Sequence, residues 1–249
     1  MKKGQITIFV ILGIVIAAVA LLAFFFRSTI LELSRETTLQ DVQTSSPLVY
    51  EAGSQVENCL LSHHDFSLRV LGLQGSIKDP KESIEYAGSK IALYKEGILK
   101  EDLEKELEGY FAENALSCLD IATSLKLEPS GIKGISASIE KEKVSINLDW
   151  PITFKTKDTT QKISHFEVQK DLRLGDMIDD INAVLAQSKE GLCLSCLADL
   201  GETKNYLIEV ETAEQNVVTI RDKNYFLDDL GDTEPAPNEF VFRFAVGEL

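Results

Sequence analysis

Apolar and polar residues follow three successive patterns along this chain. From Ile8 to Phe26, nineteen consecutive residues lack a polar side chain. From residue 47 to about 125 apolar residues recur at helical spacing, and beyond residue 129 they mostly alternate with polar ones. A long apolar run predicts a helix that can cross a bilayer, helical spacing predicts amphipathic helices, and alternation predicts half-buried strands. We therefore expect an α+β fold class, in which a long N-terminal apolar helix precedes an extracytoplasmic domain of helices and antiparallel sheet.

The apolar segment is expected to continue into a polar stalk, so that residues 5–44 form one unbroken helix. Gln5 to Phe26 would rise about 33 Å as a helix, enough for a hydrocarbon core of roughly 30 Å. Residues 27–43 are polar with sparse apolar positions. Pro47, which suits a first helical turn but not a helix interior, then starts a new element.

The flanking charges predict the orientation of this segment. Lys2 and Lys3 precede it, whereas Glu32 and Glu36 follow it. The positive-inside rule then leaves the amino end in the cytoplasm and the remainder outside. An ordinary secretory signal peptide is the alternative, but its apolar region is shorter and ends in a small-residue cleavage site.

Residues 45–128 are expected to form a helical subdomain with a hairpin. An apolar stripe predicts a helix from Pro47 to about Leu71, and two short runs around Gly88 predict a hairpin over 83–94. A second stripe predicts a helix over residues 100–125.

Residues 129–249 are expected to form an antiparallel sheet with an inserted helix. Strict alternation on either side of residues 140–143 predicts a hairpin, which continues past Pro151. Further strands are expected around 163–168, 206–210, 218–220 and 240–246, and a helix over 174–185 that ends by Gly191.

The net charge of the chain argues against anionic binding partners. All 40 acidic residues lie beyond residue 31, and removing Lys2 and Lys3 leaves 23 basic residues, so the exported part carries a formal charge of −17. Such a charge opposes binding to nucleic acid and to anionic lipid surfaces. It also makes neighbouring copies repel each other.

Four cysteines on the exported side suit two disulfides. Cys59 and Cys118 fall on the apolar stripes of two helices in one subdomain, so we expect them to pair. The C-x-x-C formed by Cys193 and Cys196 has three interpretations: a redox pair, half of a zinc site, or a local structural disulfide. We favour the structural disulfide because the preceding element is expected to be a helix, not the buried strand that precedes thioredoxin-type motifs.

No pattern of an enzyme is present. The sequence lacks the glycine-rich phosphate loops, the G-x-S-x-G motif and the H-E-x-x-H motif. His63, His64 and Asp65 suggest a metal site, but adjacent helical residues diverge by about 100° and do not easily share one ion. We expect no catalytic residue, no metal and no cofactor.

Lys3, Gly4 and Gln5, followed at once by an apolar run, resemble the class III signal peptide of archaeal type IV pilin-like proteins. The resemblance covers about a tenth of the chain. It implies that a membrane leader peptidase cuts between Gly4 and Gln5, which makes residues 1–4 a leader. In that family a glutamate linked to assembly follows the cut, and Phe9 stands at its position here.

The resemblance implies a structural subunit of a cell-surface filament with a role in adhesion. Its partners would be copies of itself, the leader peptidase, the membrane assembly machinery and, before assembly, membrane lipid. The alternative is a single-span protein whose extracytoplasmic domain binds a surface partner or assists another membrane machine. Assembly would use the apolar positions Ile8, Phe9, Ile11, Leu12, Val15, Val19 and Leu22.

Overall fold

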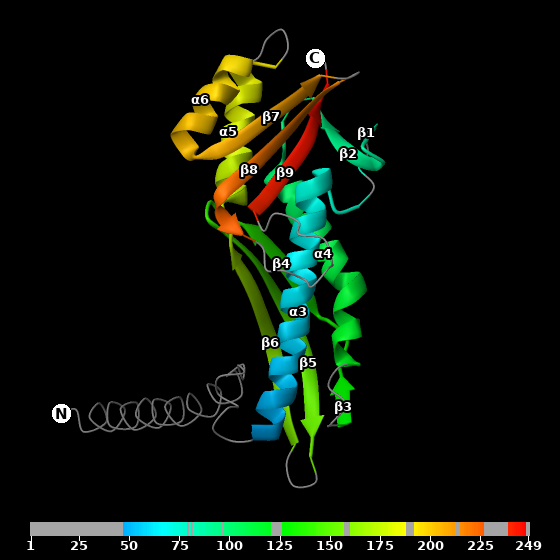
Figure 1. Cartoon of the computed structure of the whole chain (residues 1–249). Coiled ribbons are helices and arrows are strands. Elements are labelled where there is room, and N and C mark those ends of the chain that lie inside the picture. The colour runs from blue at the N-terminus through cyan, green and yellow to red at the C-terminus, as the bar shows by residue number, and fades with distance from the viewer. Residues whose placement is uncertain are drawn as a thin grey trace, which may run out of the picture. The chain divides into compact units, whose positions relative to one another are not determined.

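The computed structural model describes residues 47–78, 80, 82–95, 97–120, 126–156, 160–187, 192–212, 215–226 and 239–247 (Figure 1). By internal contacts the chain divides into Met1–Thr37 and Thr38–Leu249, and every described residue belongs to the second unit. The leader expected over 1–4 and the helix and stalk expected over 5–44 lie outside the described residues.

The fold class expected from the sequence needs correction. Over the described ranges the structure is α+β, but no helix there is long and apolar enough to cross a membrane. The longest of these helices is α3, Pro47–Gln74. It is amphipathic: Val49, Val56 and Leu60 are buried, whereas Glu51 and Asn58 are exposed. The apolar stripe of α3 is therefore buried against the rest of the domain.

The first sheet has five strands in the order β1-β2-β9-β8-β7. Neighbouring strands are antiparallel except β2 and β9, which are parallel. The β1–β2 hairpin precedes residue 129 and the other three strands follow it, so both halves of the chain share this sheet. The strands are β1 (Ser83–Tyr86), β2 (Ser89–Tyr94), β7 (Tyr206–Thr212), β8 (Asn216–Phe226) and β9 (Glu239–Val246).

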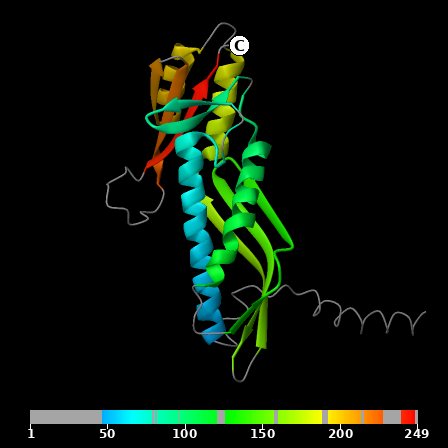
Figure 2. The same ribbon diagram turned by 90° about the vertical axis from the view of Figure 1, so that its right-hand side faces the viewer.

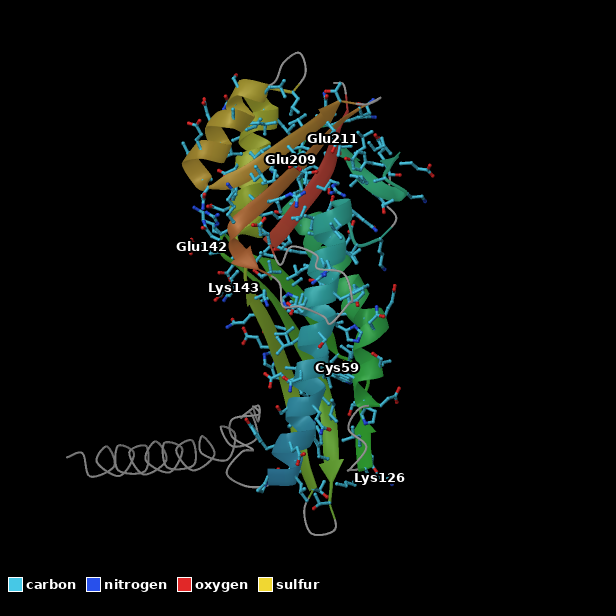
Figure 3. All side chains as sticks on the ribbon, viewed as in Figure 1. Cys59, Lys126, Glu142, Lys143, Glu209 and Glu211 are labelled. Atoms are coloured by element: carbon cyan, nitrogen blue, oxygen red, sulfur yellow. A yellow bond between two sulfur atoms is a disulfide. The ribbon has the colours of Figure 1, made fainter. Side chains whose placement is uncertain are left out.

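The second sheet is organised around the long strand β5, Lys143–Lys155. β6 (Thr160–Asp171) pairs with one edge of β5 over most of its length. β4 (Gly134–Ile139) and β3 (Lys126–Pro129) pair with successive parts of the other edge. The β4–β5 hairpin is the one expected from alternation, and Glu142 and Lys143 lie at its turn (Figure 3).

A bulge lets β5 pass its proline. The register with β6 shifts between Asp149 and Ile152. Pro151 has no N–H to donate, but its carbonyl accepts from the Ser130 N–H at 2.8 Å, and the Asp149 carbonyl accepts from the Lys133 N–H at 2.8 Å. Residues 130–133 therefore follow the same edge of β5 that β3 and β4 occupy.

Helix α3 contacts both sheets, through β9 and through β6 (Figure 1). Helix α4 (Lys100–Asn114) lies beside it and packs on β4, as the turned view shows (Figure 2). The approach to β9 is close at Gly72, where a Cβ would collide with the backbone oxygen of Val241 and the ring of Phe240. Only glycine therefore fits this crossing without a shift of the backbone.

Two further helices complete the described part of the fold. α5 (Leu174–Gln187) packs on β5, and α6 (Leu194–Lys204) packs on β7 and α5. The start of α5 is fixed to the β4–β5 turn, because the Asp176 N–H donates to the Lys141 carbonyl at 3.1 Å.

Three elements differ from the sequence-based expectation. The helix expected over 100–125 ends at Asn114 and is followed by a 3₁₀ helix, η1 (Ala115–Leu119). The Asn114 side chain donates to the Tyr110 carbonyl at 2.8 Å, and such side-chain bonds compete with helical ones. Strand β3 and helix α6 were not expected at all. Gly191, the expected end of α5, lies outside the described residues.

Candidate functional site

The residues expected to direct cleavage and assembly lie outside the described part of the chain, so the structure brings none of them together. They are Gly4, Gln5, Ile8, Phe9, Ile11, Leu12, Val15, Val19 and Leu22.

The structure bonds the cysteines in the two expected pairs, Cys59 with Cys118 and Cys193 with Cys196. The first disulfide joins α3 to η1, with a Cα–Cα distance of 5.5 Å, and closes a loop of 59 residues. Cys118 is fully buried and Cys59 partly so. This disulfide therefore ties α3, which packs on β6 of the second sheet, to η1, which follows α4.

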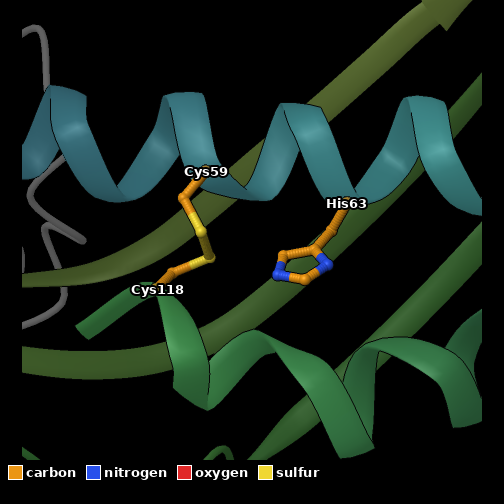
Figure 4. A group of neighbouring side chains, drawn as sticks. All are labelled: Cys59, His63 and Cys118. Carbon is orange, nitrogen blue, oxygen red and sulfur yellow. A yellow bond between two sulfur atoms is a disulfide. The ribbon is translucent and has the colours of Figure 1, made fainter. Parts of the chain in front are cut away.

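His63 lies one helical turn after Cys59 and beside the disulfide (Figure 4). Its Nδ1 is 3.1 Å from the Tyr110 hydroxyl and its Nε2 is 3.0 Å from the Ser117 Oγ. Ser117 immediately precedes Cys118, so the imidazole bridges the same two helical elements as the disulfide. We call Cys59, His63 and Cys118 with Tyr110 and Ser117 the disulfide–histidine cluster.

The hydrogen bonds of the cluster indicate where its protons lie. The Ser117 hydroxyl donates to the Asn114 carbonyl at 2.7 Å. Its oxygen therefore accepts from the His63 Nε2–H, and the free Nδ1 accepts from the Tyr110 hydroxyl. Partial burial lowers the pKa of His63, which keeps the ring neutral at pH 7.

A serine beside a histidine can also serve nucleophilic catalysis, but this pair is arranged differently. A nucleophilic serine gives its proton to the histidine, and a third group orients the histidine for that transfer. Here the Ser117 proton is directed to the Asn114 carbonyl, away from His63. The arrangement ties α4 and η1 to α3.

The three consecutive residues His63, His64 and Asp65 do not converge on one point. His64 is fully buried against the ring of Phe111, and neither ring nitrogen has a hydrogen-bond partner among the described residues. Asp65 faces Lys170 of β6, with the carboxylate 3.5 Å from the ammonium. Of these three residues only His63 belongs to a possible set of metal ligands among the described residues: ligand atoms of Cys59, His63 and Cys118 lie within 4.8 Å of one another.

The C-x-x-C element caps α6. Cys193 is the N-cap residue, and its Sγ accepts from the Cys196 N–H at 3.2 Å. Both cysteines are partly exposed, and Leu194 between them is 61% exposed. Leu194 also lines a shallow groove of about 510 Å³ between α6 and β7. A helix does follow the motif, as in redox pairs, but the described element before it is helix α5.

A partly buried ionic cluster joins α5, α6 and β8. Arg173 donates to both carboxylate oxygens of Asp222, at 2.9 and 2.6 Å, and its guanidinium lies over the ring of Tyr206 at 4.9 Å. Lys204 approaches Asp176 and Asp180 at 3.3 Å each. Burial raises the pKa of Asp180 despite its hydrogen bond with Lys204. These contacts fix the junction of the three elements.

Sequence reasoning missed both clusters because their members are remote in sequence. Arg173 and Asp222 are 49 positions apart, and His63 and Ser117 are 54 apart. One signal was available: Cys59 and His63 are four residues apart on a helix, so His63 had to lie near any disulfide formed by Cys59.

No protein-family model, curated protein or solved structure matches this chain.

Proposed function

We propose that the chain is an exported, pilin-like structural subunit of an archaeal cell-surface filament and has no enzymatic activity of its own. Its apolar N-terminal segment makes the contacts between copies, and its extracytoplasmic domain is displayed outside. The observation that carries this proposal is the position of α3 in the fold.

Helix α3 begins at Pro47, directly after the apolar and stalk residues, and it contacts both sheets. A force applied through the N-terminal segment therefore enters the domain along α3 and reaches both sheets. The disulfide to η1 adds a covalent connection at Cys59. A subunit anchored through one terminal segment needs such a central element.

The charge distribution supports assembly through the apolar segment alone. The part beyond the leader carries −17, so copies of the domain repel each other at low salt. Acidic side chains such as Glu209 and Glu211 project from β7 (Figure 3). The domains face solvent, and side-chain packing between apolar segments supplies the attraction.

Phe9 supports a second function, a membrane-anchored accessory or binding protein. In pilin-like proteins the corresponding glutamate is linked to assembly. A phenylalanine there leaves the leader site formed by Gly4 and Gln5 intact but removes that group.

Four observations on cells distinguish the two functions. Sequencing of the amino end should begin at Gln5, and electron microscopy of sheared surface material should show filaments that contain the chain. Gly4→Leu should leave the protein in the membrane fraction at its unprocessed mass. Val15→Asp should abolish filaments after normal cleavage, whereas the control Val15→Leu should retain them.

The filament function is wrong if the wild-type protein keeps residues 1–4 and occurs only as a detergent-soluble membrane species. That outcome would establish the anchored form. A third outcome, in which Val15→Asp assembles normally, would refute assembly through the apolar segment.

A further inference from the structure

We propose that the disulfide–histidine cluster is also a metal site: when its disulfide is reduced, Cys59, Cys118 and His63 bind a thiophilic divalent cation such as Zn²⁺. The cluster would then have two alternative cross-links between α3 and η1, a disulfide when oxidised and a metal ion when reduced. This inference does not depend on filament assembly.

The backbone already holds the three ligands at suitable positions. A tetrahedral zinc ion with bonds of about 2.3 Å to sulfur and 2.0 Å to nitrogen places its ligand atoms roughly 3.5–3.8 Å apart. The ligand atoms of the three residues lie within 4.8 Å of one another, and the two cysteine Cα atoms are 5.5 Å apart. Breaking the sulfur–sulfur bond lets the sulfurs separate by rotation of their side chains.

His63 is presented in the orientation that a ligand needs. Figure 4 shows one ring nitrogen turned toward the sulfur atoms. The Tyr110 hydroxyl lies 3.1 Å from Nδ1 and can accept a hydrogen bond as well as donate one. Moving the ring proton from Nε2 to Nδ1 would free Nε2 for the metal and leave Nδ1–H donating to Tyr110. A polar partner on the second nitrogen is the usual support of a metal-bound histidine.

Access and coordination number also fit. Cys118 is buried, but His63 is partly exposed and its contact with Ser117 lies on the exposed side. Three protein ligands leave one position of a tetrahedral ion for water. Two thiolates neutralise the charge of a divalent cation.

A disulfide reductant and a disulfide oxidant interconvert the two forms of the cluster. Reduction adds two electrons and two protons to the disulfide, which gives two thiols. Metal binding releases those two protons, because the thiolate is the ligand. Reoxidation by a small-molecule disulfide takes two electrons from the two thiolates, forms the protein sulfur–sulfur bond and frees the metal. The oxidant is split into two thiolates, which take up two protons from water.

The test uses the full chain in detergent, with Cys193 and Cys196 replaced by serine so that the second thiol pair cannot bind metal. The protein is reduced with a phosphine, freed of reductant under inert gas, and titrated with Co²⁺ and then Zn²⁺. We expect one equivalent of Co²⁺ to bind with the absorption of tetrahedral thiolate coordination and to be displaced by Zn²⁺. The oxidised protein should bind none.

Variants assign the ligands. His63→Gln should weaken Co²⁺ binding at least tenfold, Tyr110→Phe should weaken it while keeping the stoichiometry of one, and Lys126→Gln, remote on β3, should leave it unchanged. Circular dichroism spectra recorded before and after metal addition test whether reduction unfolds the chain. If it does, Zn²⁺ should restore the native spectrum only when His63 is present. Absence of Co²⁺ binding by the reduced chain, or equal affinity in His63→Gln, would overturn the proposal.

Discussion

The buried imidazole of His64 should make this fold sensitive to acid. The ring is fully buried on α3, and within the part of the chain that the structure describes neither nitrogen has a hydrogen-bond partner. Burial lowers the pKa of His64 to about 4, and the positive charge of Lys170 adds to the effect. The carboxylate of Asp65, the next residue, lies 3.5 Å from the ammonium of that lysine. His64 is therefore a neutral histidine in the native state.

The size and sign of the effect follow from linkage. An unfolded histidine has a pKa of about 6.5, so the native value of about 4 is lower by roughly 2.5 units, or about 3 kcal/mol at 1.36 kcal/mol per unit. Below pH 6.5 the unfolded chain binds a proton that the native chain does not. The contribution of His64 to stability is therefore complete above pH 6.5 and is lost as the pH falls to about 4.

Urea unfolding at constant ionic strength from pH 7 to pH 4 measures this loss. His64→Leu should lack about 3 kcal/mol of the pH dependence of the wild type and should be no less stable near pH 4, because leucine cannot be protonated. His165→Gln, which removes a partly exposed histidine from β6, should keep the wild-type dependence. Parallel curves for the wild type and His64→Leu would refute the reasoning.

Two further predictions concern covalent and ionic cross-links. Cys59→Ser should lower the free energy of unfolding by about 4 kcal/mol, because its disulfide closes a loop of 59 residues. Cys193→Ser should lower it by no more than about 2 kcal/mol, because its disulfide closes a loop of 3. Chemical denaturation of both variants measures these losses, and equal losses would contradict the loop argument. Asp222→Ala should destabilise the fold by about 3–5 kcal/mol, because it leaves the 13%-exposed guanidinium of Arg173 without its carboxylate; a loss below 1 kcal/mol in the same assay would show that the pair contributes little.

The elements that sequence reasoning predicted are those whose pattern is local. The β4–β5 hairpin follows from alternation on both sides of a short turn, and the burial of Phe240, Phe242 and Phe244 on one face of β9 follows from the same period. Each of these patterns is complete within one or two neighbouring segments.

Strand pairings and contacts between segments that are far apart in the sequence could not be predicted, because no local sequence pattern marks them. Nothing in residues 89–94 indicates that β2 will lie parallel to β9, some 150 positions later. Helix α6 is short, and its cap is a cysteine sulfur, not the serine, threonine or aspartate that marks a helix start in sequence. The end of α4 at Asn114 depends on a side-chain hydrogen bond that competes with the helix.

The difference in exposure between the two disulfides predicts the order in which they are reduced. Cys193 and Cys196 are both partly exposed at the start of α6, where the Cys196 N–H and the helix N-terminus stabilise a thiolate on Cys193. Cys118 is fully buried, so an attacking thiol reaches the other disulfide only when α3 and η1 separate. Under a limiting dithiol in native buffer, alkylation and mass spectrometry should find Cys193 and Cys196 modified first and Cys59 protected. Adding urea below the unfolding midpoint should speed modification of Cys59 and Cys118 but not that of Cys193 and Cys196. The opposite order would mean that α3 and η1 separate readily in the native state, and α3 would then be too loosely held to connect the N-terminal segment with both sheets.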